Sequence, residues 1–179
     1  WTLSGNGSAG QTWSITGGTL VGDSSSLVGN IDDGAALVFD QASDGNYAGL
    51  VSGAGSLTKT GTGTLTLSGA NSYSGGTFIN AGTLSVAADG NLGDSSGAVS
   101  IGNATLQAGA SFSSSRAIEI TNSAHIDSQG FDVTLAGPIT TASYGNLIKD
   151  GAGTLTLTGH ANSYQGTGID RSEERRGGE

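Results

Sequence analysis

Residues 57–76 read LTKTGTGTLTLSGANSYSGG, and residues 147–167 repeat them as LIKDGAGTLTLTGHANSYQGT with one residue, His160, inserted. Both copies carry a lysine (Lys59 and Lys149), then two glycines, the run Thr-Leu-Thr-Leu, and finally Asn-Ser-Tyr. So long a match within one small chain is hard to obtain by chance. It predicts a repeat architecture.

Within each copy the run Thr-Leu-Thr-Leu alternates with a period of two, which places both leucines on one face of a strand. No window carries the apolar spacing of an amphipathic helix, and glycine recurs too often for a helix to persist. The chain is therefore predicted to be all-β. The alternating runs are Thr12–Ile15, Ala36–Phe39, Thr64–Leu67, Thr83–Val86, Val99–Ile101, Ala117–Ile120, Asp132–Leu135 and Thr154–Leu157.

Strands this short cannot bury enough apolar surface by themselves. Stacking them as parallel coils builds a continuous core and pairs the backbone hydrogen bonds. The sequence therefore predicts a single-stranded parallel β-helix, a solenoid open at both ends. Coils of roughly 20–25 residues give about seven or eight turns and a rod some 35 Å long. A lectin-like β-sandwich is the competing architecture, but it does not account for the duplicated stretch.

Glycine and asparagine mark the predicted corners of the coils. The glycines before each strand are expected to take positive φ, because glycine alone does so without steric cost. Asn71 and Asn162 tolerate left-handed backbone, and their amides can bond neighbouring backbone groups. The corner glycines are Gly61, Gly63, Gly151 and Gly153.

The formal net charge is −9, and only three basic residues, Lys59, Arg116 and Lys149, lie before the last nine positions. A nucleic-acid partner needs a basic face that neutralises phosphates, so nucleic-acid binding is excluded. An anionic membrane surface is disfavoured for the same reason. The chain has no cysteine, which removes disulfides and thiolate metal sites. Single aspartates beside Gly, Ser or Asn are interpreted as turn residues on a solvated surface.

Three glycine-rich or acidic motifs resemble known sites, and each has a better interpretation as a turn. Residues 93–97 match G-x-S-x-G, yet a strand rather than a helix is predicted to follow them. Residues 5–10 match G-x-G-x-x-G without the strand and helix that a phosphate site needs. The acidic stretches 32–34 and 40–45 lack the spacing of a calcium loop.

Single polar side chains offer little chemistry. His125 is expected on a surface or corner, because no second histidine or cysteine lies near it in the sequence. His160 is expected at a loop tip. Arg116 and Glu119 could form a surface ion pair, which is worth little. No catalytic, cofactor-binding or metal-ligating residue is predicted.

Three tyrosines, each followed two residues later by glycine, could stack on sugars. The preferred interpretation is that each ring packs across its own coil corner. They are Tyr47, Tyr73 and Tyr164.

The pattern Leu-x-Lys-x-Gly-x-Gly-x-Leu-x-Leu-x-Gly, followed by Asn-x-Tyr-x-Gly, resembles the autotransporter-associated β-strand repeat. That repeat, also called the passenger-associated transport repeat, occurs in passenger domains of type V secreted proteins of Gram-negative bacteria. The resemblance covers roughly residues 30–168. It implies a right-handed β-helix and a partner outside this sequence, the C-terminal outer-membrane β-barrel of the same polypeptide.

The resemblance further implies a structural role. The chain is expected to be a stalk that aids secretion, displayed at the cell surface or secreted, and part of an adhesin with a host or bacterial surface ligand. The alternative is a β-helical polysaccharide-degrading enzyme, which would place aspartates beside lysine or arginine on adjacent coils. The expected class is therefore non-enzymatic, with no cofactor.

The predicted solenoid spans residues 1–168, and the start at Trp1 without methionine indicates a piece of a longer protein. Residues 169–179 are highly charged and have no periodicity. The string Arg-Ser-Glu-Glu-Arg-Arg within them resembles a translated sequencing adapter. This tail is interpreted as non-native and is left out of the fold prediction.

Overall fold

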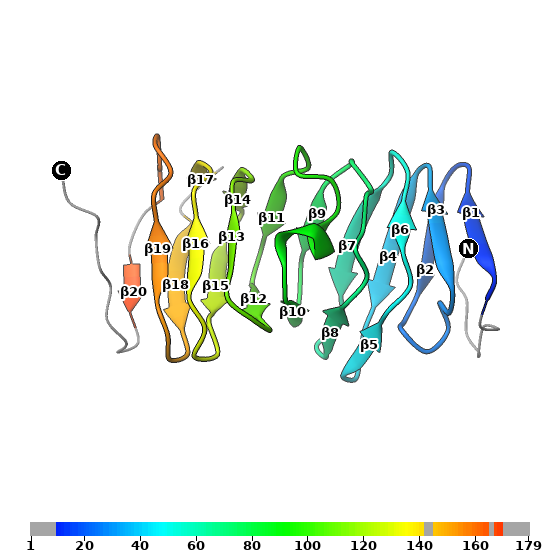
Figure 1. The fold of residues 1–179 in the computed structure, drawn as a ribbon, viewed down its shortest axis with the longest axis horizontal. Helices are drawn as coiled ribbons and strands as arrows, with labels where there is room; N and C mark the ends of the chain where they lie inside the picture. Colours follow the sequence, from blue (N-terminus) through cyan, green and yellow to red (C-terminus); the bar gives the residue numbers. More distant parts are fainter. Residues whose placement is uncertain (1–9, 142–144, 165–166, 170–179) are drawn as a thin grey trace.

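A computed structural model describes residues 10–141, 145–164 and 167–169, and these form an elongated β-solenoid (Figure 1). In each complete coil the chain passes over three faces in a fixed order. The first face holds β2 (Thr19–Gly22), β4 (Ala36–Asp40), β7 (Ser56–Thr60), β9 (Thr77–Ile79), β11 (Val99–Ile101), β14 (Ile118–Ile120) and β17 (Ile139–Thr141). The second face holds β5 (Gly45–Tyr47), β8 (Thr64–Leu67), β10 (Thr83–Val86), β12 (Ala104–Ala108), β15 (Ser123–Asp127), β18 (Asn146–Asp150) and β20 (Thr167–Ile169).

The third face is interrupted. It holds β1 (Thr12–Ile15), β3 (Asn30–Asp33) and β6 (Val51–Ser52) toward one end, and β13 (Phe112–Ser114), β16 (Val133–Leu135) and β19 (Leu155–Leu157) toward the other. Between these groups the described chain forms no strand on this face. A single 3-10 turn, η1 (Asp89–Leu92), stands there instead (Figure 1).

Every strand ladder in the described part of the chain is parallel, and each strand inside a sheet pairs with the coils before and after it. Leu37 pairs with Leu57, which pairs with Thr77, so these coils take 20 residues each. Parallel pairing in every ladder of the described residues confirms the predicted solenoid and excludes the competing β-sandwich. All eight predicted strands are present with boundaries within one residue, and further strands that were not predicted, such as β7, β12, β15 and β18, show the same inward and outward alternation.

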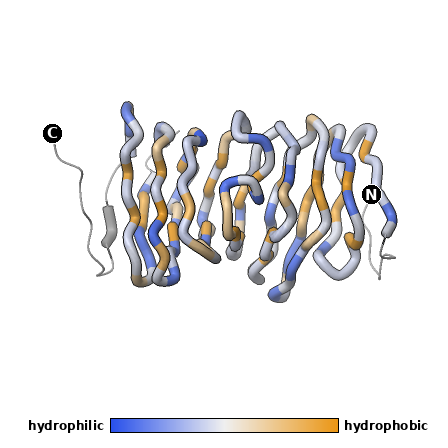
Figure 2. Tube along the Cα trace, viewed as in Figure 1, coloured by the Kyte–Doolittle hydropathy of each residue, from blue (hydrophilic) through white to orange (hydrophobic). Residues whose placement is uncertain are grey.

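The core is a stack of layers, and each coil contributes one layer of inward side chains from its faces. On the second face Leu65 pairs with Leu84, and Leu84 pairs with Leu106. Each of these leucines is at most 2% exposed, whereas the threonines beside Leu65 point outward and are half-buried. Figure 2 shows the result, short apolar segments that alternate with polar ones along each coil.

The two copies of the repeat lie on different faces of the solenoid. The lysine strand and the leucine strand of the first copy, β7 and β8, lie on the first and second faces. The corresponding strands of the second copy, β18 and β19, lie on the second and third faces. All three faces require the same alternation of inward and outward residues. The repeat is therefore compatible with any face, and the length of the intervening coils decides which one it occupies.

Asp33 departs from the prediction that aspartates are surface turn residues. It follows Ile31 at the second inward position of β3 and is 0% exposed. Its Oδ1 accepts the Ala35 amide at 3.1 Å, and its Oδ2 has no donor among the described residues. Burial raises the pKa of Asp33, and the neighbouring charge of Asp32 raises it further. The hydrogen bond from the Ala35 amide lowers the pKa and partly offsets these effects.

Asp33→Asn is therefore expected to raise the melting temperature at pH 7, with the gain shrinking toward pH 4. The pKa of Asp33 in the folded chain lies above its unfolded value of about 3.9. The contribution of Asp33 to the free energy of unfolding is therefore complete below the unfolded pKa, and it is lost as the pH rises through the folded pKa. Circular dichroism melts across this pH range measure the effect. Asp32→Asn is the control, since Asp32 is exposed on the same strand. Equal gains in both variants would indicate a general charge effect and contradict the prediction.

Candidate functional site

The repeat lysine is buried at the end of its strand. In β7 the alternation directs Leu57 and Lys59 inward, and Lys59 is 0% exposed. Its Nζ donates to the carbonyls of Thr60 at 2.7 Å, Gly61 at 2.8 Å and Ala81 at 3.1 Å. These bonds use all three ammonium donors. Because Ala81 belongs to the following coil, the lysine ties two coils together at a corner.

Lys149 repeats this arrangement on the next face. It is 7% exposed, and its Nζ donates to the carbonyls of Asp150 at 3.0 Å and Gly151 at 2.7 Å. Burial lowers the pKa of both lysines, and nearby carboxylates such as Asp40 beside Lys59 oppose that shift. The sequence identified these lysines as repeat positions. The signal for a structural role is that each lysine stands two residues after an inward leucine, at a position that also faces the core.

The corner glycines allow the carbonyls to turn toward the lysine. Gly61 has φ +74° and Gly151 has φ +73°, in the left-handed region. A side chain at Gly61 would also collide with the backbone carbonyl of Gln41 in the preceding coil. Gly153 confirms the prediction of positive φ, whereas the prediction for Gly63 is wrong. Gly63 is needed for close approach instead, since a Cβ there would meet the Ser43 backbone.

The repeat asparagines bond backbone groups of adjacent coils, as predicted, but neither adopts left-handed backbone. Asn71 Oδ1 accepts the Val51 amide at 2.8 Å, and its Nδ2 donates to the Asn91 carbonyl at 2.7 Å. Asn162 Oδ1 accepts the Ile139 amide at 2.9 Å in the equivalent way. These amides replace the ladder hydrogen bonds where the chain turns a corner.

The residue inserted in the second copy changes the corner without displacing Asn162. His160 is exposed in a bend, as expected of a loop tip. The next residue, Ala161, takes φ +66°. Left-handed backbone at a residue other than glycine costs roughly 1–2 kcal/mol, so the second corner is more strained than the first.

The corner tyrosines pack inside the solenoid, which confirms the packing interpretation and leaves no ring face for a sugar at Tyr47 or Tyr73. Tyr47 is 2% exposed, lies 4.9 Å from the Phe39 ring centre, and donates to the Gly29 carbonyl. Tyr73 is 0% exposed and bonds Thr77 Oγ1 at 2.7 Å. Tyr164 is half-buried against the core. Burial raises the pKa of Tyr47 to about 12.

Arg116 does not pair with Glu119, so that prediction is wrong. Glu119 points outward from β14 and is exposed, whereas Arg116 is 3% exposed. Its guanidinium bonds both carboxylate oxygens of Asp89, with Nε to Oδ1 at 2.8 Å. It also donates to the carbonyls of Asp89, Gly93, Asp94 and Gly97. Arg116 thus holds segment 87–98 over the interruption of the third face.

Residues 93–97 form the predicted turn, whereas Asp32 and Asp33 of the acidic stretch 32–34 lie in strand β3 and are not turn residues. Within the G-x-S-x-G match, Asp94 Oδ1 accepts the Ser96 amide at 2.9 Å and the Ser96 hydroxyl at 2.6 Å, and strand β11 follows. Asp44 Oδ1 accepts the Thr64 amide of the next coil at 2.7 Å, which lowers the pKa of Asp44. The G-x-G-x-x-G match lies almost wholly outside the described residues.

His125 lies on the outside of the second face. Its Nδ1 is 2.6 Å from Asp150 Oδ2, and each side chain is 35% exposed. Within residues 10–141, 145–164 and 167–169, no three histidine, cysteine or acidic side chains come together in a way that could hold a metal ion. In the same ranges no helix is long and apolar enough to span a membrane.

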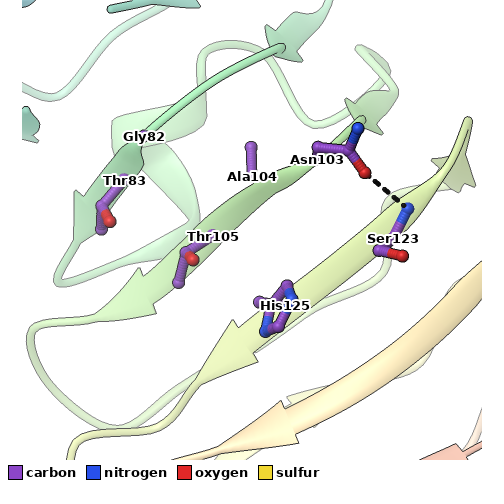
Figure 3. A pocket seen from close by; sticks show the side chains of 7 residues that line it. All are labelled: Gly82, Thr83, Asn103, Ala104, Thr105, Ser123 and His125. Atoms are coloured by element: carbon purple, nitrogen blue, oxygen red, sulfur yellow. Dashed lines mark hydrogen bonds between the residues drawn. The ribbon is translucent and has the colours of Figure 1, made fainter. Parts of the chain in front are cut away.

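A shallow hollow of about 310 Å³ adjoins His125 on the second face (Figure 3). Its polar lining consists of Thr83 on β10, Asn103 and Thr105 at β12, and Ser123 and His125 on β15. Sequence patterns did not indicate this site, because its residues come from three coils about 20 residues apart.

Comparisons with known proteins agree with the repeat structure. The family described as passenger-associated-transport-repeat matches residues 57–86 and 147–170. The chain is 35% identical over 176 residues to the adhesin BmaC autotransporter of Brucella suis biovar 1 (strain 1330). The match covers 87% of this chain and spans 5% of that relative's length. No solved structure matches the chain significantly.

Proposed function

We propose that this β-solenoid, with its two matches to the passenger-associated-transport repeat, is part of an autotransporter passenger and is displayed outside a bacterial cell as a stalk. The observation that carries the proposal is the pair of buried lysine corners. Both lysines are bonded to corner carbonyls, and the repeat asparagines Asn71 and Asn162 bond backbone groups of adjacent coils. Its partner is the outer-membrane β-barrel of the same polypeptide, and the adhesin name of the relative supports a role in adhesion.

The role proposed is also non-enzymatic. The alternative, a β-helical polysaccharide-degrading enzyme, is expected to place basic side chains beside acids along an open groove. All three basic residues before position 169, Lys59, Arg116 and Lys149, are buried and bonded to backbone carbonyls. None of them is available to a substrate on the outer surface.

The test is display through a barrel. The chain is placed between a signal peptide and an autotransporter barrel in a Gram-negative host, and antibody labelling of intact cells measures the surface fraction. The wild-type chain is expected to be labelled with the barrel and unlabelled without it. A chain that stays inside the cell although the barrel inserts would overturn the proposal.

Replacing both repeat lysines, Lys59→Met with Lys149→Met, is expected to lower the surface fraction and to increase digestion by added protease. Each substitution removes the ammonium donor from at least two corner carbonyls, and a hydrogen bond to a charged group is worth about 1.5–3 kcal/mol. The control is Thr58→Met with Ile148→Met, which alters the neighbouring outward positions. Equal display of the two double variants would mean that the lysine corners are not required.

A further inference from the structure

The hollow beside His125 has a regular construction. Its two walls are rows of outward side chains, and its floor lies between them where Gly82 has no side chain and Ala104 points into the core. One wall is Thr83, Thr105 and His125, which pair in register across β10, β12 and β15. The other wall is Asn103 and Ser123, two residues earlier along their strands (Figure 3).

These rows set the size of the opening. Walls two residues apart along a strand are separated by roughly 7 Å, and three adjacent strands span roughly 10 Å. These are spacings between backbone positions, and a small ring compound of similar width can lie against the two rows of side chains. The volume of about 310 Å³ is at the lower end of the range for small-molecule sites.

The walls carry hydrogen-bonding capacity that the described protein does not use. The side-chain hydroxyls of Thr83, Thr105 and Ser123 have no hydrogen-bond partner in the described part of the chain. Asn103 Oδ1 accepts the Ser123 amide at 3.5 Å, which leaves its two amide protons available. Asp150 accepts from His125 Nδ1, so His125 Nε2 remains for a further bond.

The chemistry of this lining selects among ligand classes. No lysine, arginine, aspartate or glutamate lines the hollow, and the chain has a formal net charge of −9, so an anionic ligand is disfavoured. The lining holds no large apolar or aromatic side chain, so an apolar ligand gains little. Hydroxyl groups, which both donate and accept, match the lining best.

We propose that this hollow is a subsite for a neutral sugar ring, bound by hydrogen bonds to Thr83, Thr105, Asn103, Ser123 and His125. Without an aromatic platform the expected affinity is low, with a dissociation constant in roughly the millimolar range. Many copies displayed on one surface would raise the avidity. Binding by the purified chain does not depend on the proposed stalk role, so either proposal can fail while the other stands.

The test is saturation-transfer difference NMR on the full 179-residue chain with the methyl glycosides of glucose, galactose, mannose and N-acetylglucosamine. At least one probe is expected to receive saturation from the protein. Thr83→Val with Thr105→Val should reduce that signal several-fold, since valine keeps the shape and removes the hydroxyls. Thr134→Val on β16, an outward threonine of the third face, is the matched control and should leave the signal unchanged.

Three outcomes would overturn the proposal. They are no saturation of any neutral probe, equal signals from the double variant and the Thr134→Val control, and binding only of the charged sugar N-acetylneuraminic acid. Circular dichroism of each variant verifies that a lost signal does not come from unfolding.

Discussion

Leu65→Asp is expected to abolish the single cooperative unfolding transition of the solenoid and to leave the surrounding coils unfolded at room temperature. Leu65 is 0% exposed, and its neighbours in adjacent coils are Leu84 and Gly45. Losing a buried leucine costs about 2–5 kcal/mol, and burying an unpaired carboxylate adds several more. Together they approach the total stability of a typical domain, about 5–15 kcal/mol.

The solenoid geometry makes this cost unavoidable. Each coil contributes a single layer of inward side chains. Leu65 therefore packs only against its own layer and those of the two adjacent coils, and no further layer can rearrange to supply a partner for the charge. Since each coil depends on its neighbours, the defect divides the rod. Thermal and urea unfolding followed by circular dichroism measure the effect, and hydrogen exchange locates it. Thr66→Asp, outward on the same strand, should cost no more than about 1 kcal/mol. A wild-type melting curve for Leu65→Asp would show that Leu65 does not face the core.

Arg116→Met is expected to lower the free energy of unfolding by about 2–4 kcal/mol, because it removes the charge-assisted hydrogen bonds from the nearly buried guanidinium to the partly exposed Asp89 carboxylate. The same change removes the donors for four backbone carbonyls in segment 87–98. The loss should therefore appear first as faster proteolysis and hydrogen exchange in that segment, before the rod unfolds globally.

Glu119→Gln provides the matched control for Arg116, because it removes the opposite charge from the same part of the sheet. Glu119 is exposed on β14 and does not contact Arg116 as a partner, so its replacement should change stability by less than about 0.5 kcal/mol. Similar losses in the two variants would contradict the clamp and restore the Arg116–Glu119 pair that spacing along the chain suggested.

The residues of the repeat corners could be predicted from the sequence, but the groups that they bond could not. The lysines, glycines and asparagines stand out in the sequence because they recur at matching positions in both copies. Their partners do not, since Lys59 reaches the Ala81 carbonyl and Asn71 reaches Val51, each about one coil away. The same limit applies to the hollow beside His125, whose walls come from three coils.

By itself the sequence determined eight of the strands, the inward and outward positions of their alternating residues, and the parallel stacking. These follow from local properties, namely a period of two, glycine corners and a duplicated stretch. The tertiary structure alone decided that the two copies occupy different faces, that Asp33 is buried, and that Arg116 bonds Asp89. Those outcomes depend on which residues face one another in adjacent coils. That register is set by the summed lengths of coils whose local patterns are nearly alike.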